Sequence, residues 1–180
     1  MKTSHRSASQ RGVTLVEAAI VLTVTAVVAG TAAPSLQRLI DARRLEGVAT
    51  QLATDIHFIR TEAVARNQAL RLSVQATAAG SCYVLHTGAA NQCSCAAVGP
   101  AQCGGDAQQI KTVTLAAADR IGLQANVGSM LFDPVHGTST PAGTLRLTGA
   151  HDRAIHHVVN IMGRVRSCSP QAAVPGYRAC

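Results

Sequence analysis

The chain carries one apolar run that is long enough to cross a membrane as a helix. Val13–Ala33 is 21 residues long, and Glu17 is its one ionisable residue. About 20 apolar residues suffice for a helix to span a bilayer. Residues 1–11 are polar and basic, with Lys2, Arg6 and Arg11 and no acid. Because cationic flanks stay in the cytoplasm, we expect a single-pass helix with the rest of the chain on the far side.

Glu17 is the costly residue of this run. A carboxylate at mid-membrane costs about 2.5–3.5 kcal/mol, so it predicts a function and a partner. An ordinary secretory signal has its cleavage site after the apolar region. Ala32-Ala33-Pro34-Ser35 fits such a site poorly, whereas the small residue Gly12 lies between the basic leader and the run.

Arg11-Gly12-Val13-Thr14-Leu15-Val16-Glu17 with the apolar run resembles the N-terminus of type IV prepilins. The resemblance implies that prepilin peptidase removes residues 1–12, that Val13 becomes the N-methylated first residue, and that Glu17 pairs with the N-terminal amine of a neighbouring subunit in the filament. Val13 stands where the family usually has phenylalanine. A plain signal anchor with an incidental acid is the alternative.

The apolar period beyond Pro34 is that of a half-buried helix. The residues on this stripe are Leu36, Leu39, Ile40, Val48, Leu52, Ile56, Ile59 and Ala63. We therefore expect one helix from roughly Thr14 to Asn67 with a bend at Pro34, where proline removes a helix hydrogen bond. Residues 13–34 form its membrane and filament-core part, and residues 35–67 form its amphipathic half.

The remaining chain alternates as β-strands do. The strand candidates are Leu70–Val74, Cys82–Leu85, Lys111–Leu115, Met130–Phe132, Thr144–Thr148 and His157–Ile161. One helix followed by antiparallel strands predicts an α+β, pilin-like fold. We expect a β-rich globular domain over residues 68–162, with a Cys-rich loop at 82–103, and a basic tail over residues 163–180.

The chain has six cysteines: Cys82, Cys93, Cys95, Cys103, Cys168 and Cys180. An even number in an exported domain favours disulfides. The first four allow three pairings, and the sequence does not choose among them. Cys168 and Cys180 are the natural remaining pair, which would hold Arg178 near Arg164 and Arg166. A metal site with His86 is the alternative, but paired Cys-x-x-Cys spacing is absent, so we expect no metal.

Three stretches of the soluble part resemble the GspH/FimT group of minor pilins and pseudopilins. They are Ile59-Arg60-Thr61-Glu62-Ala63-Val64-Ala65-Arg66-Asn67, Leu131-Phe132-Asp133-Pro134-Val135-His136-Gly137 and Gly163-Arg164-Val165-Arg166. In FimT-type minor pilins, a Gly-Arg-x-Arg motif near the C-terminus binds DNA during natural transformation. The resemblance implies that Gly163, Arg164 and Arg166 form such a site, with Arg178 and Arg153 in support.

The chemistry of this motif agrees with phosphate binding. Arginines two positions apart project to one side of an extended segment, glycine permits close backbone approach, and guanidinium groups bind phosphate oxygens bidentately. The segment from Arg146 to Cys180 has five arginines and one acid, a net charge of +4. The leader holds three of the 16 basic residues, so the mature chain, with nine acids, is also +4.

Few aromatic residues are present to stack on bases: two tyrosines and two phenylalanines. We therefore expect non-specific binding to the phosphate backbone, with a log–log salt slope of about −2 to −3 and a dissociation constant of about 10⁻⁴–10⁻⁶ M per subunit.

No nucleophile elbow, zinc-protease motif or phosphate loop is present, so we expect neither an enzyme nor a cofactor. Three functions compete: a DNA-binding minor pilin of the transformation machinery, a structural minor pilin, and a minor pseudopilin of a type II secretion system. All three imply other pilins and prepilin peptidase as partners. They also imply the inner membrane of a Gram-negative bacterium, with a periplasmic C-terminal domain that later reaches the pilus or cell surface.

Overall fold

The computed structural model describes residues 14–96 and 99–180, and the chain divides into two compact units after Gln37. The helix α1, Leu15–Ala65, has Pro34 within its bounds. It is the one helix of the described residues that is long and apolar enough to cross a membrane, by length and composition. Gly12 and Val13, the predicted processing site, lie outside the described residues.

The domain half of α1 buries a stripe that repeats every three and four residues. Its members are Ala42, Leu45, Ala49, Leu52, Asp55, Ile56, Ile59 and Ala63. The predicted stripe was wrong at its start, since Leu36, Leu39 and Ile40 are half or more exposed. Burial begins where the helix first meets the sheets. At its end, Asn67 has φ 49°, and the Asn67 and Gln68 amides bond the Val64 and Ala63 carbonyls. This is a Schellman cap.

Eleven strands follow within the described residues. They are β1 Leu70–Thr77, β2 Gly80–His86, β3 Cys93–Ser94, β4 Gln102–Cys103, β5 Gln109–Ala116, β6 Gly122–Ala125, β7 Ser129–Phe132, β8 Ser139–Thr140, β9 Gly143–Thr148, β10 Ala154–Val159 and β11 Val165–Cys168. Two short 3₁₀ helices, η1 Ala117–Asp119 and η2 Pro170–Ala172, complete the elements.

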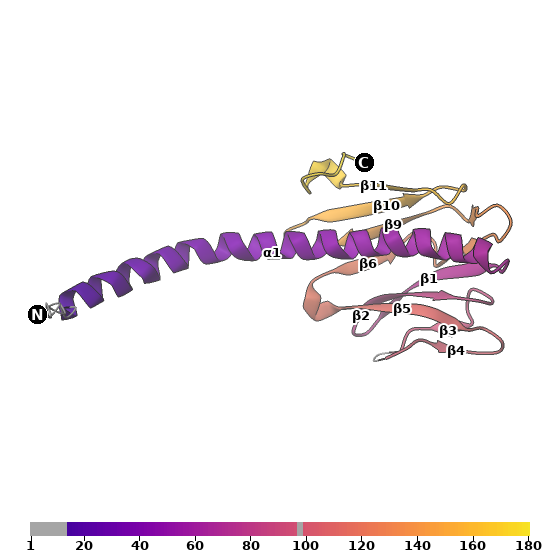
Figure 1. Ribbon diagram of the computed structural model, residues 1–180, viewed down its shortest axis with the longest axis horizontal. Helices are drawn as coiled ribbons and strands as arrows, with labels where there is room; N and C mark the ends of the chain where they lie inside the picture. Colours follow the sequence, from indigo (N-terminus) through magenta and orange to yellow (C-terminus); the bar gives the residue numbers. More distant parts are fainter. Residues whose placement is uncertain (1–13, 97–98) are drawn as a thin grey trace, which may run out of the picture. The chain divides into compact units, whose positions relative to one another are not determined.

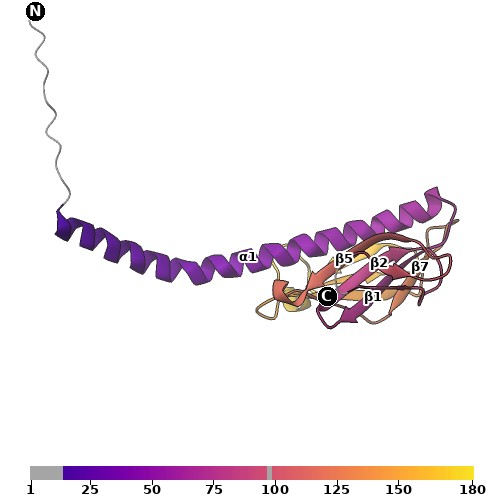
Figure 2. The same cartoon turned by 90° about the horizontal axis from the view of Figure 1, so that it is seen from below.

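The strands form two main antiparallel sheets. The first sheet has the order β5-β2-β1-β7-β8, and the second sheet has the order β11-β10-β9-β6. Strands β3 and β4 pair separately. The domain half of α1 lies across both sheets (Figures 1 and 2). Tyr83 of the first sheet bonds Asp55 of the helix, and His157 of the second bonds the Ala49 carbonyl. The expected α+β, pilin-like fold is confirmed.

The second sheet differs from the prediction at its later strands. The expected strand at His157–Ile161 begins earlier and ends at Val159, because Asn160–Gly163 form the hairpin turn to β11. The expected tail over residues 163–180 is not a separate segment, since β11 pairs with β10 along its length. Strand β6 was not predicted, because Gly122–Ala125 has no β-branched or aromatic residue to mark it as a strand.

One core fills the space between α1 and the sheets. The largest fully buried side chains include Tyr83, Phe132, Leu52, Ile56 and Leu147. The Cys-rich segment contains the disulfides Cys82–Cys95 and Cys93–Cys103. This is one of the three pairings that the sequence left open.

Candidate functional site

The outer face of the second sheet, away from α1, gathers basic side chains. Alternate residues of a strand face opposite sides. Ile155, His157 and Val159 are buried, so His156 and Val158 face outward. Residues opposite each other in neighbouring strands share a face. Val158 is opposite Arg166 of β11, and His156 is opposite Arg146 of β9, so both arginines belong to this outer face.

The segment Ser169–Cys180, here called the arm, folds back beside β11. The disulfide Cys168–Cys180 closes it, and the Ser169 amide donates to the Arg178 carbonyl at 2.8 Å. A hollow of about 530 Å³ lies between the arm and the sheet. Arg166 and Arg178 both line this hollow, together with Val158 and the disulfide. The fold thus brings together two of the predicted site residues that are 12 positions apart in sequence.

Arg164 lies in the β10–β11 turn, two positions before Arg166. Arg164 and Arg166 are exposed, and Val165 between them packs against the core. The Arg164 amide donates to the Asn160 side chain at 2.9 Å, and the Asn160 amide donates to the Arg164 carbonyl at 3.1 Å. These two bonds fix the backbone from which the Arg164 side chain extends.

Gly163 has a packing requirement of its own. Its φ is 68°, and a Cβ at this position would lie 2.5 Å from the Gly137 carbonyl oxygen. Arg60 of α1 donates from Nε to that same carbonyl at 2.9 Å. Gly163 is therefore required where the turn meets the Gly137 loop and the helix. This contact accounts for the glycine whether or not a phosphate approaches.

Arg153 lies apart from the other predicted arginines. It is half-buried immediately before β10, and its guanidinium donates to the Arg38 carbonyl of α1 at 3.1 Å. The arginine is thereby held against the helix rather than on the outer face of the sheet. Its predicted supporting role stays a prediction.

The outer face carries positive charge without a partner acid. Within residues 14–96 and 99–180, no ion pair involves Arg146, Arg164, Arg166 or Arg178. Burial lowers the pKa of His156 below its usual 6.5, and the Arg146 guanidinium lowers it further. At neutral pH the arginines therefore supply the charge. Such a surface suits a polyanion.

Two other histidines are buried inside the domain. His157 bonds the Ala49 carbonyl and the Ser167 hydroxyl, at 2.9 and 2.8 Å. His86 bonds the Ser73 hydroxyl at 2.8 Å and the Thr87 carbonyl at 2.7 Å. Burial is the main cause that lowers the pKa of both. No cluster of metal ligands occurs in the part of the chain that the structure describes.

A buried carboxylate that the sequence patterns did not predict joins α1 to the first sheet. Asp55 accepts from the Tyr83 hydroxyl at 2.7 Å and from Lys111 Nζ at 2.6 Å. Burial is the main cause that raises the pKa of Tyr83, with Asp55 adding to it, so the phenol is a neutral donor. An acid within the apolar stripe of a helix was the available signal. The arrangement is structural, because all three groups are committed to one another.

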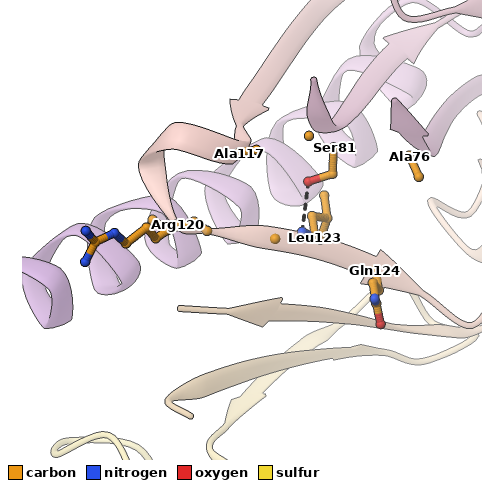
Figure 3. Close-up of a pocket in the computed structure, with 9 residues that line it drawn as sticks. Ala76, Ser81, Ala117, Arg120, Leu123 and Gln124 are labelled. Carbon is orange, nitrogen blue, oxygen red and sulfur yellow. Dashed lines mark hydrogen bonds between the residues drawn. The ribbon is translucent and has the colours of Figure 1, made fainter. Parts of the chain in front are cut away.

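A second hollow, of about 330 Å³, lies where the two sheets meet. Figure 3 shows the Ser81 hydroxyl accepting from the Leu123 amide at 2.9 Å at this place. Among its described lining residues, Arg120 is the one with an ionisable side chain. A lone arginine beside small residues and backbone offers no set of groups for acid–base or nucleophilic chemistry.

Glu17 lies in the first turn of α1, where its amide donates to the Thr14 hydroxyl at 3.2 Å. The positive end of the helix dipole stabilises a carboxylate in the first turn. Its predicted partner is a group of another subunit, so its assembly role stays a prediction.

Comparisons with known proteins agree with this fold. Residues 48–163 match the family model "Type II transport protein GspH", and residues 7–33 match the prokaryotic N-terminal methylation motif. The crystal structure of the type IV minor pilin FimU from Pseudomonas aeruginosa is similar, with 19% identity and a TM-score of 0.52. The match covers 72% of this chain and 94% of that one. No protein of curated function matches the sequence.

The GspH match ends at Gly163, so Arg164, Arg166 and the arm lie beyond it. The methylation motif implies processing by prepilin peptidase, assembly with other pilins and anchoring in the inner membrane. With the family model covering more than half of the 180 residues, the chain belongs to the GspH family, as a minor type IV pilin or GspH-like pseudopilin.

Proposed function

We propose that this chain is a minor pilin that binds extracellular DNA through its phosphates and supports DNA uptake in natural transformation. The observation that carries the proposal is the cluster of exposed arginines at β11 and the arm. Arg166 and Arg178 line one hollow, Arg164 lies two residues from Arg166, and none of the three has an acidic partner in the described chain.

Guanidinium groups that are exposed and unpaired keep their donors free for phosphate. Contacts of this kind read charge and not sequence. With two or three phosphates neutralised, the log–log salt slope is about −2 to −3. One subunit then binds weakly, at about 10⁻⁴–10⁻⁶ M, and several subunits in a filament bind more strongly through avidity. In this arrangement the domain is periplasmic before assembly and displayed on the pilus afterwards.

The test uses residues 38–180, a compact unit with its own core and all three disulfides. This domain is titrated into labelled duplex DNA at about 50 and 200 mM salt, beside Arg164→Gln/Arg166→Gln. The matched control is Arg43→Gln/Arg44→Gln, two exposed helix arginines away from the second sheet's outer face. Salt-sensitive binding that the first variant loses and the control keeps supports the proposal.

Two other results point elsewhere. Equal binding by the wild type and Arg164→Gln/Arg166→Gln keeps DNA as the ligand but removes the motif as its site. No binding by the wild type well above the roughly 10⁻⁴ M expected of non-specific contacts favours the second candidate. That candidate, favoured by the GspH and FimU likenesses, is a pilin or pseudopilin that acts in filament assembly or secretion without DNA.

A further inference from the structure

A fourth arginine, Arg146, lies on the same outer face as Arg166 but on another strand. Arg146 of β9 is opposite His156 of β10, which is opposite Cys168 of β11. Thr144 of β9 is opposite Val158, which is opposite Arg166. Arg146 and Arg166 are thus two strands and two residues apart. With strands about 4.8 Å apart and a rise of about 3.4 Å per residue, their Cα atoms lie roughly 12 Å apart.

We propose that Arg146 is a phosphate-binding residue, and that the outer face of the second sheet contacts both strands of duplex DNA. Arg146 contacts one strand, and Arg166, Arg178 and Arg164 contact the other. This inference rests on the proposed DNA binding and adds to it a further residue and the form of DNA that is bound.

The spacing of these two backbone positions suits a duplex. The grooves of B-DNA are about 6 and 12 Å wide, so phosphates on the two strands face each other across comparable distances. Between the arginines the face is formed by His156, Val158 and Thr144, with no carboxylate among these outward residues. Gln124 of β6, opposite Arg146, is exposed and neutral. The face therefore offers cations at both sides and nothing that repels phosphate between them.

The aromatic residues of the chain do not form a stacking platform on this face. Tyr83 and Phe132 are buried, Tyr177 packs against the core, and Phe58 belongs to α1. Proteins that hold single strands use aromatic platforms, each worth about 1–3 kcal/mol per base. Without them a single strand gains phosphate contacts alone. A duplex, whose phosphates are already spaced across a groove, gains from all four arginines.

The experiment measures binding of the 38–180 domain to a short duplex and to each of its separated strands, over a series of salt concentrations. We expect the wild type to bind the duplex more tightly than either separated strand. Arg146→Gln should make the duplex salt slope shallower by about 1, which weakens binding about eightfold at 0.1 M salt, and should leave the single-strand slope unchanged. Arg146→Lys should restore the slope, and Arg43→Gln is the charge-matched control.

Circular dichroism and the melting temperature of each variant exclude misfolding, which is a small risk because Arg146 is exposed. The inference is overturned if Arg146→Gln leaves the duplex slope unchanged while the wild type binds DNA. It is also overturned if the wild type binds the duplex and the single strands with equal affinity and Arg146→Gln weakens both by the same factor. A wild type that binds neither form fails differently, because that result removes the proposed function itself.

Discussion

Replacing Cys168 and Cys180 by serine removes the link that holds Arg178 beside Arg166. The bond closes a loop of 12 residues' separation, which the chain-entropy model values at about 3 kcal/mol of unfolding free energy. The arm keeps other anchors. Val174 is fully buried, and the Cys180 amide donates to the Ser169 carbonyl at 3.3 Å. We therefore expect a folded domain that is less stable by up to about 3 kcal/mol.

The same change should weaken DNA binding through Arg178. An arm that is free to move presents this guanidinium at the hollow for part of the time, so up to one phosphate contact is lost. One contact fewer makes the salt slope shallower by about 1 and the affinity about eightfold weaker at 0.1 M salt. The assays are urea denaturation for stability and fluorescence anisotropy with labelled duplex for binding.

Arg178→Gln with the disulfide intact separates the two effects. It should reproduce the loss of affinity without the loss of stability, because Arg178 is exposed and makes no ion pair within the described residues. When Arg178→Gln is added to Cys168→Ser/Cys180→Ser, the DNA affinity should fall little further, since both changes remove the same Arg178–phosphate contact. Full affinity and an unchanged slope in the cysteine-free variant would refute the reasoning that the disulfide positions Arg178.

Three further predictions concern the domain itself. Gly163→Ala should lower the unfolding free energy, measured by urea denaturation, by about 2–4 kcal/mol, because of the positive φ and the close Gly137 carbonyl. Gly176→Ala, also at positive φ but in open space, should lower it less, and equal losses would contradict the packing role. The unfolding free energy should fall as the pH drops below about 6.5, because the unfolded chain takes up protons that buried His86 and His157, with their lowered pKa values, resist; constant stability between pH 8 and 5 would exclude this. Asp55→Ala should lower the unfolding free energy by about 3 kcal/mol, since it leaves the buried Tyr83 hydroxyl without its acceptor. A melting temperature equal to the wild type's would show that the hydroxyl finds another partner.

The sequence alone predicted the elements that local patterns control. A single ionisable residue in 21 predicts a membrane-length helix. The period beyond Pro34 predicts the buried stripe from Leu52 onward. Alternation located β1, β2, β5, β7 and β9 to within a few residues. These signals lie between neighbours in the chain, where the spacing of side chains is fixed by backbone geometry.

The sequence also contained the arginines, but not their arrangement. The spacing of Arg164 and Arg166 is local and could be read directly from the motif. That Arg178 shares a hollow with Arg166, that Arg153 is held by the Arg38 carbonyl, and that Arg146 is on the same face as Arg166 depend on contacts between distant segments.

Tertiary structure decided these points for a physical reason. The register of β9, β10 and β11 results from burying Leu145, Ile155 and Val165 against the core, and a shift by one residue would turn every arginine to the other face. The disulfide then fixes the arm to that register. The charge of this region was determined by the sequence, and the surface that it forms was determined by packing.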